Sequence, residues 1–285
     1  MAFLWLLAPA VVAAGGEAVR LKTEEGLTAR GLYAPGEPDR PAVLLLHGFL
    51  QTHDFPTVRR LADALNEDEG YPVLTPTLTL GIDDRSSSLA CEAVQKHDME
   101  QAVKEISAWV AWLIRRGHER MVLVGHSTGS VMITAYLERA SPEVKQAILV
   151  SLTHFGPRQA VFKKEAGEAL SLARSRMDDA KTQEGLADFS IAYCRRYVTT
   201  PARILSYYAW NARKVLEALA SSPVPVTVIL GTKDKRMDGD WVASLEPLPR
   251  VRLKFVEGAD HFFDAEHEFS LLEAVLETLE ELEAQ

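Results

Sequence analysis

The sequence predicts an α/β fold in which helices flank a mostly parallel central sheet. Short, uniformly apolar segments, which are typical of strands buried on both faces of a sheet, alternate with longer segments whose apolar residues recur at helical spacing. Proline and glycine separate many of these segments, as expected for the turns between them. Regular alternation of strand and helix favours right-handed crossovers and therefore parallel pairing of the strands.

The first half of the chain supplies most of the predicted sheet. Residues 18–22 and 27–34 are expected to form an opening hairpin, and the apolar residues 42–46 a strand buried on both faces. Further strands are predicted over 72–75, 121–124 and 146–151, and helices over 56–69, 98–116 and 130–139.

The pattern changes at about residue 153. Up to about residue 206 the sequence is polar and helical in character, with Ala166, Leu170 and Ala173 at helical spacing and no strand pattern. We expect this insertion, residues 153–206, to form a helical cap. Strands over 226–230 and 251–256 and a last amphipathic helix then resume the alternation, so residues 17–285 are predicted to be one α/β domain carrying the cap.

Composition narrows the classes of partner. A chain of 285 residues with 47% hydrophobic residues can bury a sizeable core, and its share of charged residues is ordinary for a globular protein. The formal net charge of -9 argues against nucleic acid, because proteins that bind phosphate backbones concentrate Lys and Arg. We expect no nucleic-acid partner.

The N-terminal segment, residues 1–16, is either a signal peptide or an N-terminal segment that is buried or trimmed. Its apolar run ends in small residues suited to signal peptidase, but no Lys or Arg precedes Arg20. The run is too short for a stable transmembrane anchor. The two cysteines, Cys91 and Cys194, fit a disulfide in an exported protein or two thiols in the cytosol. A periplasmic or secreted location is favoured, with the cytoplasm as the alternative.

The residues Gly125-His126-Ser127-Thr128-Gly129 match the pattern G-x-S-x-G. The motif lies between a predicted strand and a predicted helix, which is the context that makes it a nucleophile elbow. Small residues are needed there because the sharp turn strains the backbone and brings neighbouring segments close. Ser127 is therefore the candidate nucleophile.

A nucleophilic serine needs donors for the oxyanion that forms on the attacked carbonyl. His47-Gly48-Phe49 follows the buried strand 42–46, at the sheet edge where Ser127 is also expected. The backbone N–H groups of Phe49 and Thr128 are the candidate oxyanion-hole donors. The His47 side chain is expected only to hydrogen-bond the neighbouring loop.

The serine also needs a base and an acid that orients the base. Among the eight histidines, His261 follows the last predicted strand and is the candidate base. Asp234 follows the preceding strand and is the candidate acid, in the chain order Ser, Asp, His. Its rivals are Asp238, Asp240 and Asp260, of which the first two are expected to lie farther out or to cap a helix, and the third to point away from His261.

A metal cluster is the competing interpretation of the C-terminal loop. Asp260, His261, Asp264 and His267 have side chains that bind divalent ions. The triad already uses His261, so we expect neither a metal nor a cofactor.

Together, His47-Gly48-Phe49, the elbow, Gly231-x-x-Asp234 and Asp260-His261 resemble the α/β-hydrolase superfamily of esterases, lipases and related enzymes. The resemblance covers most of residues 17–285. It implies the α/β-hydrolase fold and, because the nucleophile is serine, a hydrolase of the EC 3.1 class that cleaves a carboxylic ester or thioester through an acyl-enzyme on Ser127. A small-molecule or lipid-like ester is the implied substrate.

Several alternatives stay open. The same triad could serve carbon–carbon bond hydrolysis or perhydrolysis, or the fold could belong to a non-catalytic binding protein. The loop over residues 77–88 either overhangs the site or is an ordinary surface loop. Five aromatic residues of the cap region either line a substrate pocket or pack the cap onto the sheet: Tyr193, Tyr197, Tyr207, Tyr208 and Trp210.

Overall fold

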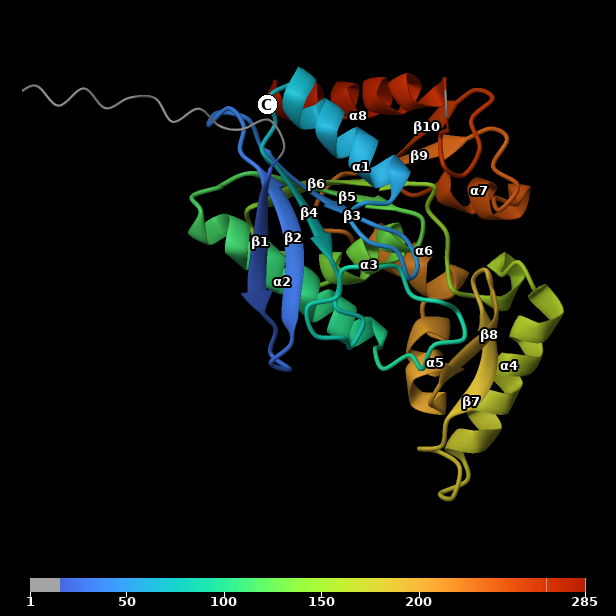
Figure 1. Cartoon of the computed structure of the whole chain (residues 1–285). Helices are drawn as coiled ribbons and strands as arrows, with labels where there is room; N and C mark the ends of the chain where they lie inside the picture. Colours follow the sequence, from blue (N-terminus) through green and yellow to red (C-terminus); the bar gives the residue numbers. More distant parts are fainter. Residues whose placement is uncertain (1–15, 265, 285) are drawn as a thin grey trace, which may run out of the picture.

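The computed structural model describes residues 16–264 and 266–284. Within these residues, eight strands form the central sheet in the order β1-β2-β4-β3-β5-β6-β9-β10 (Figure 1). The predicted opening hairpin is present, and β2 pairs antiparallel with both β1 and β4, whereas the other neighbours pair in parallel. The strands are β1 (Glu17–Lys22), β2 (Thr28–Ala34), β3 (Ala42–Leu46), β4 (Val73–Thr77), β5 (Met121–His126), β6 (Val144–Val150), β9 (Val226–Gly231) and β10 (Val251–Val256).

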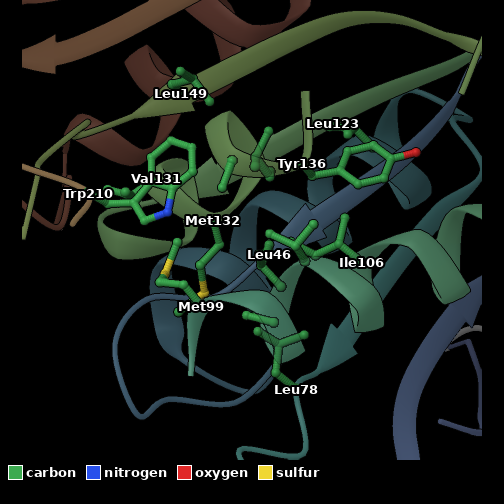
Figure 2. Close-up of a cluster of buried hydrophobic side chains, with 14 of the residues drawn as sticks. Leu46, Leu78, Met99, Ile106, Leu123, Val131, Met132, Tyr136, Leu149 and Trp210 are labelled. Atoms are coloured by element: carbon green, nitrogen blue, oxygen red, sulfur yellow. The ribbon is translucent and has the colours of Figure 1, made fainter. Parts of the chain in front are cut away.

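Helices cover both faces of this sheet (Figure 1). Side chains alternate along a strand, so Val43 and Leu45 of β3 enter one hydrophobic core and Leu44 and Leu46 the other. Helices α1 (Pro56–Asp63) and α8 (His267–Glu283) enclose the first core, and α2 (Met99–Arg115), α3 (Thr128–Leu137) and α6 (Ala212–Ala220) the second, part of which Figure 2 shows.

Local sequence signals set the helix ends. Helix α2 begins with a capping box, because Asp98 accepts a hydrogen bond from the backbone N–H of Gln101 and the Gln101 side chain accepts one from the backbone N–H of Asp98. Helix α1 begins at Pro56 and continues directly into a π-helical turn, Ala64–Asp68. The single helix predicted over 56–69 is therefore two consecutive helical segments.

The cap region departs from its prediction. It contains the expected helices α4 (Lys163–Met177) and α5 (Pro201–Tyr208), but also an antiparallel hairpin of β7 (Ala187–Ile191) and β8 (Cys194–Thr199). The expectation that this segment holds no strand is wrong. The hairpin is short and polar on its exposed side, so its sequence lacks the apolar run of the central strands. A short 3-10 helix, Pro157–Gln159, precedes α4, and α7 (Gly239–Leu245) follows β9.

A disulfide fastens the cap hairpin to the loop that precedes α2. Cys91 and Cys194 are bonded, with their Cα atoms 5.4 Å apart, so the structure contains the disulfide rather than two free thiols. Close to it, Val94 pairs with Val198 of β8, and the Gln95 backbone N–H donates to the Val198 carbonyl at 2.8 Å. An isolated two-stranded hairpin is only marginally stable in water. The disulfide and the pairing with a third segment therefore stabilise this one.

The predictions about the N-terminal segment and about a transmembrane anchor can be compared only with the described residues. The interpretation of residues 1–16 as a signal peptide or N-terminal segment lies, apart from Gly16, outside them. No helix of the described part is both long and apolar enough to cross a membrane.

Candidate active site

The candidate nucleophile lies in a sharp turn between β5 and α3. Ser127 has φ 57° and ψ −123°, a conformation that non-glycine residues rarely adopt. Such strain costs of order 1–3 kcal/mol and persists only where the surrounding structure enforces it. The turn leaves the serine hydroxyl at the carboxyl edge of the parallel strands.

Steric crowding requires glycine at positions 125 and 129 of the motif. A Cβ atom on Gly129 would lie 2.5 Å from the His47 carbonyl oxygen, and one on Gly125 would lie 2.7 Å from the Gly129 carbonyl carbon. Both contacts are with backbone, which cannot move aside as a side chain can. The turn therefore packs directly against the loop that follows β3.

The structure brings the three predicted side chains together. Nε2 of His261 lies 2.9 Å from Oγ of Ser127, and Nδ1 of His261 lies 2.6 Å from Oδ2 of Asp234. All three residues are at most 9% exposed. The second carboxylate oxygen of Asp234 accepts a hydrogen bond from the backbone N–H of Arg236 at 2.9 Å, which fixes the carboxylate.

The rival acids are engaged elsewhere. Asp238 caps α7 by accepting from the Trp241 backbone N–H at 2.8 Å, and Asp240 lies in the first turn of the same helix. Asp260 accepts from the backbone N–H of Phe262 at 2.9 Å. None of the three forms a hydrogen bond to His261 in the described part of the chain.

His126, beside the nucleophile, is turned away from it. Its Nε2 lies 2.9 Å from the backbone carbonyl of His261, so this ring nitrogen carries a proton and donates. Burial, with the nearby His261, lowers the pKa of His126 to about 3. The ring is a neutral structural group that holds the His261 loop.

The two candidate oxyanion donors lie beside the serine. Phe49 and Thr128 line one small cavity together with Ser127 and His261. Across residues 16–264 and 266–284, neither the Phe49 nor the Thr128 backbone N–H donates to another protein group. Both groups are thus available to a bound ligand, and Thr128 is also the first residue of α3, where the helix dipole favours negative charge.

His47 holds the loop that carries Phe49, as predicted. Its Nδ1 donates to the Gly48 carbonyl at 2.8 Å, and its Nε2 accepts from the Leu78 backbone N–H at 3.1 Å. Burial and the nearby Arg85 guanidinium lower the pKa of His47 to about 3, so the ring is neutral.

Sequence reasoning missed Arg85. This buried guanidinium donates to the carbonyl oxygens of Leu78, Ser87 and Gln51, each at 2.7 Å. Burial lowers its pKa to about 10, which still leaves it charged at neutral pH. The loop 77–88 therefore packs beneath the Phe49 loop and braces it, which neither interpretation of that loop anticipated. Arg85 directly follows Asp83 and Asp84 in the sequence, so no local pattern marked it as a buried residue.

Residues of the hairpin β7–β8 contact the Phe49 loop beside the site. The Tyr193 hydroxyl donates to the Phe49 carbonyl at 2.9 Å, and the Tyr197 ring stacks on that of Phe49 with centroids 5.6 Å apart. The cavity measures about 30 Å³, small beside the roughly 300–1,000 Å³ of typical ligand pockets. Of the five cap aromatics, Tyr193 lines the cavity, whereas the other four are buried packing residues: Tyr197, Tyr207, Tyr208 and Trp210.

The alternative of a metal cluster finds no geometric support. No group of three or more His, Cys, Asp or Glu side chains suited to a metal ion occurs in the portion that the structure describes. Within this portion, the Nδ1 atom of His267 lies 3.3 Å from the backbone carbonyl oxygen of Asp264.

The parallel sheet, the strand–turn–helix at Ser127 and the hydrogen-bonded chain of serine, histidine and aspartate define a protein of the α/β-hydrolase class. The sequence agrees: the profile of the alpha/beta hydrolase family matches residues 43–271. The chain belongs to this family.

Solved structures share the fold at low sequence identity. GrgF, an alpha/beta hydrolase from Penicillium sp. sh18, superposes with a TM-score of 0.72 at 18% identity, over 94% of this chain and 99% of that one. Est1E from Butyrivibrio proteoclasticus gives 0.67 at 18% identity, over 95% and 100%. The thioesterase domain from the curacin biosynthetic pathway gives 0.62 at 19% identity, over 92% and 99%. No curated protein sequence matches the chain.

Proposed function

We propose that the protein is a serine hydrolase that cleaves a carboxylic ester or thioester through an acyl-enzyme on Ser127. The observation that carries the proposal is the continuous hydrogen-bonded chain from Ser127 Oγ through His261 to Asp234, at 2.9 Å and 2.6 Å. A serine hydroxyl is a poor nucleophile at neutral pH, and this arrangement is the one that activates it.

The residues then take separate roles. Nε2 of His261 accepts the Ser127 proton as Oγ attacks the carbonyl carbon, and Asp234 stabilises the imidazolium. The Phe49 and Thr128 N–H groups donate to the resulting oxyanion. His261 returns the proton to the leaving alcohol or thiol, the acyl-enzyme forms, and a water deprotonated by His261 releases the acid and restores the serine.

The cap and the family favour a small-molecule or lipid-like ester as the substrate, and no cofactor enters the mechanism. The thioesterase domain among the structures of the same fold supports the thioester option for this chain. The small cavity means that an acyl chain must displace cap side chains such as Tyr193 on binding.

The test is hydrolysis of p-nitrophenyl acetate and octanoate by the wild type and by Ser127→Ala and His261→Ala. We expect both variants to lose activity by about 10⁴-fold or more, as triad removal does elsewhere. Ser171→Ala, which changes an exposed cap serine, is the matched control and should retain full activity. Folded wild type without activity on either ester, or a fully active Ser127→Ala, would refute the proposal.

We further infer that the protein works in the periplasm or outside the cell. The Cys91–Cys194 disulfide supports this location, because disulfides persist in oxidising compartments and are rare in the cytosol. Fractionation of cells expressing the full chain with a C-terminal tag tests it. Recovery in the cytosolic fraction with two titratable thiols would contradict it.

A further inference from the structure

One cation lies at the wall of the catalytic cavity. Arg236 lines it together with Ser127 and His261, and Arg236 follows the candidate acid Asp234 by two residues. It forms no salt bridge with a carboxylate anywhere in residues 16–264 and 266–284. Within the described residues, no carboxylate is therefore paired with this positive charge.

The position of Arg236 is fixed on three sides. Its backbone N–H donates to Asp234 at 2.9 Å, its backbone carbonyl accepts from the Gln159 side chain, and its guanidinium carbon lies 4.9 Å from the centroid of the Phe262 ring. A flexible surface arginine loses side-chain freedom when it binds a ligand, but one that already rests on an aromatic ring and a fixed backbone loses less.

The cavity wall contains no acidic residue to balance this charge. The carboxylate of Asp234 is nearby, but its side chain is 0% exposed and already bonded to His261 and to the Arg236 backbone. Of the two histidines of the wall, His261 belongs to the triad, and burial lowers the pKa of His154 to about 4, so that His154 is neutral. The rest of the wall combines aromatic and aliphatic side chains, including Phe155 and Val161, with the uncharged polar side chains of Thr128, Thr153 and Gln159.

An unpaired, half-buried guanidinium at the wall of a cavity that also holds aromatic and aliphatic side chains suits one kind of ligand group in a protein of net charge -9. A carboxylate accepts two parallel hydrogen bonds from a guanidinium, and the pair is stronger where water is excluded. The apolar side chains of the wall, such as Phe155 and Val161, suit a short carbon chain between that carboxylate and the reacting carbonyl. We propose that Arg236 selects ester or thioester substrates that carry a second, ionised carboxylate, such as half-esters of dicarboxylic acids; this rests on the proposed hydrolase function.

Two pairs of esters test the proposal and locate the carboxylate. The first pair places it on the acyl side: p-nitrophenyl hemiglutarate against p-nitrophenyl pentanoate. The second pair places it on the leaving group: 4-carboxyphenyl butanoate against 4-methylphenyl butanoate. Because the esters of a pair differ in intrinsic reactivity, the quantity compared is the ratio of their kcat/KM values in each enzyme variant.

In at least one pair, Arg236→Gln should lower the ratio of anionic to neutral ester by roughly ten- to a hundredfold, mainly through a higher KM for the anionic ester. Arg236→Lys should retain part of the ratio. Lys235→Gln, which removes an exposed charge from the adjacent residue outside the cavity wall, should match the wild type. Raising the salt concentration should reduce the ratio in the wild type more than in Arg236→Gln.

The proposal would be overturned if the ratio of anionic to neutral ester were the same in wild type and Arg236→Gln for both pairs. It would also be overturned if Lys235→Gln lowered the ratio as much as Arg236→Gln does, because that would indicate a general effect of charge. Failure of the hydrolase function gives a different result, because the neutral esters would then not be cleaved by the wild type in a Ser127-dependent way.

Discussion

At the scale of single residues, direct backbone contact sets the spacing between the nucleophile turn at Ser127 and the loop that carries Phe49. The Gly129 backbone lies directly against the His47 carbonyl, in the loop that carries Phe49. Any side chain there must push the nucleophile turn and the Phe49 loop apart.

Gly129→Ala should therefore lower both stability and activity. The added Cβ would meet the Leu46 and His47 carbonyl oxygens at 2.9 Å and 2.5 Å, and overpacking of this kind typically costs about 1–3 kcal/mol. Gly167→Ala is the matched control, since a Cβ there meets nothing within 4 Å inside α4 and should stabilise the protein by about 0.5–1 kcal/mol. Urea denaturation and ester hydrolysis measure both effects, and an unaltered Gly129→Ala enzyme would show that the close packing is not required.

The sequence predicted the three triad residues of this site but neither Arg85 nor Arg236. Ser127, Asp234 and His261 follow strands whose carboxyl ends share one sheet edge, so topology alone predicts that they meet. Arg85 could not be predicted in the same way, because its three carbonyl partners belong to loops whose paths depend on tertiary packing. Arg236 lies in an irregular turn, where sequence periodicity gives no direction to a side chain.

At the scale of elements, the buried strands were predictable and the cap hairpin was not. A strand such as β3 is apolar throughout because both its faces are covered. Strand β8 has exposed Arg195 and Arg196 and is held by the Cys91 disulfide and by pairing with Val94, none of which leaves a local pattern.

We expect the cap hairpin to limit access to Ser127 through Tyr193. The Tyr193 hydroxyl is bonded to the Phe49 carbonyl, and the cavity below is too small for an acyl chain. Tyr193→Phe keeps the ring and removes this link, so we expect a several-fold lower KM for p-nitrophenyl octanoate and little change for the acetate. Steady-state kinetics on the two esters measure this, and equal changes for both would argue against the cap as the barrier.

At the scale of the whole molecule, the cap is held to the α/β domain by covalent and polar contacts together. The disulfide spans 103 residues of sequence, so its removal frees a long loop in the unfolded chain. The double variant Cys91→Ser, Cys194→Ser should lose roughly 2–5 kcal/mol of unfolding free energy. Equilibrium urea unfolding, with and without reductant, checks this: reductant should destabilise the wild type and leave the double variant unchanged.

A buried histidine makes the same interface sensitive to acid. His97 contacts the hydroxyls of Tyr207 and Tyr197, and burial, with the charges of Arg85 and Arg203, lowers its pKa to about 3. Between pH 6.5 and about 3 the unfolded chain binds a proton at this residue and the folded one does not, so stability falls as the pH falls.

His97→Gln removes this one contribution. The stability of the wild type relative to the variant should be constant above about pH 6.5 and should decrease by about 1.4 kcal/mol per pH unit below it. Urea unfolding of both proteins at several pH values between 4 and 8 measures the difference, in which the effects of His47 and His126 cancel. A difference that does not change with pH would show that folding does not lower the pKa of His97, and would contradict this prediction.

The central claim is that Ser127 forms a covalent intermediate, and intact-protein mass spectrometry after treatment with a fluorophosphonate tests it most directly. The account predicts one added phosphonyl group per chain, located by peptide mapping on Ser127, and no addition to Ser127→Ala. A folded wild-type protein that remains unlabelled, or a label on another residue that persists in Ser127→Ala, would contradict it.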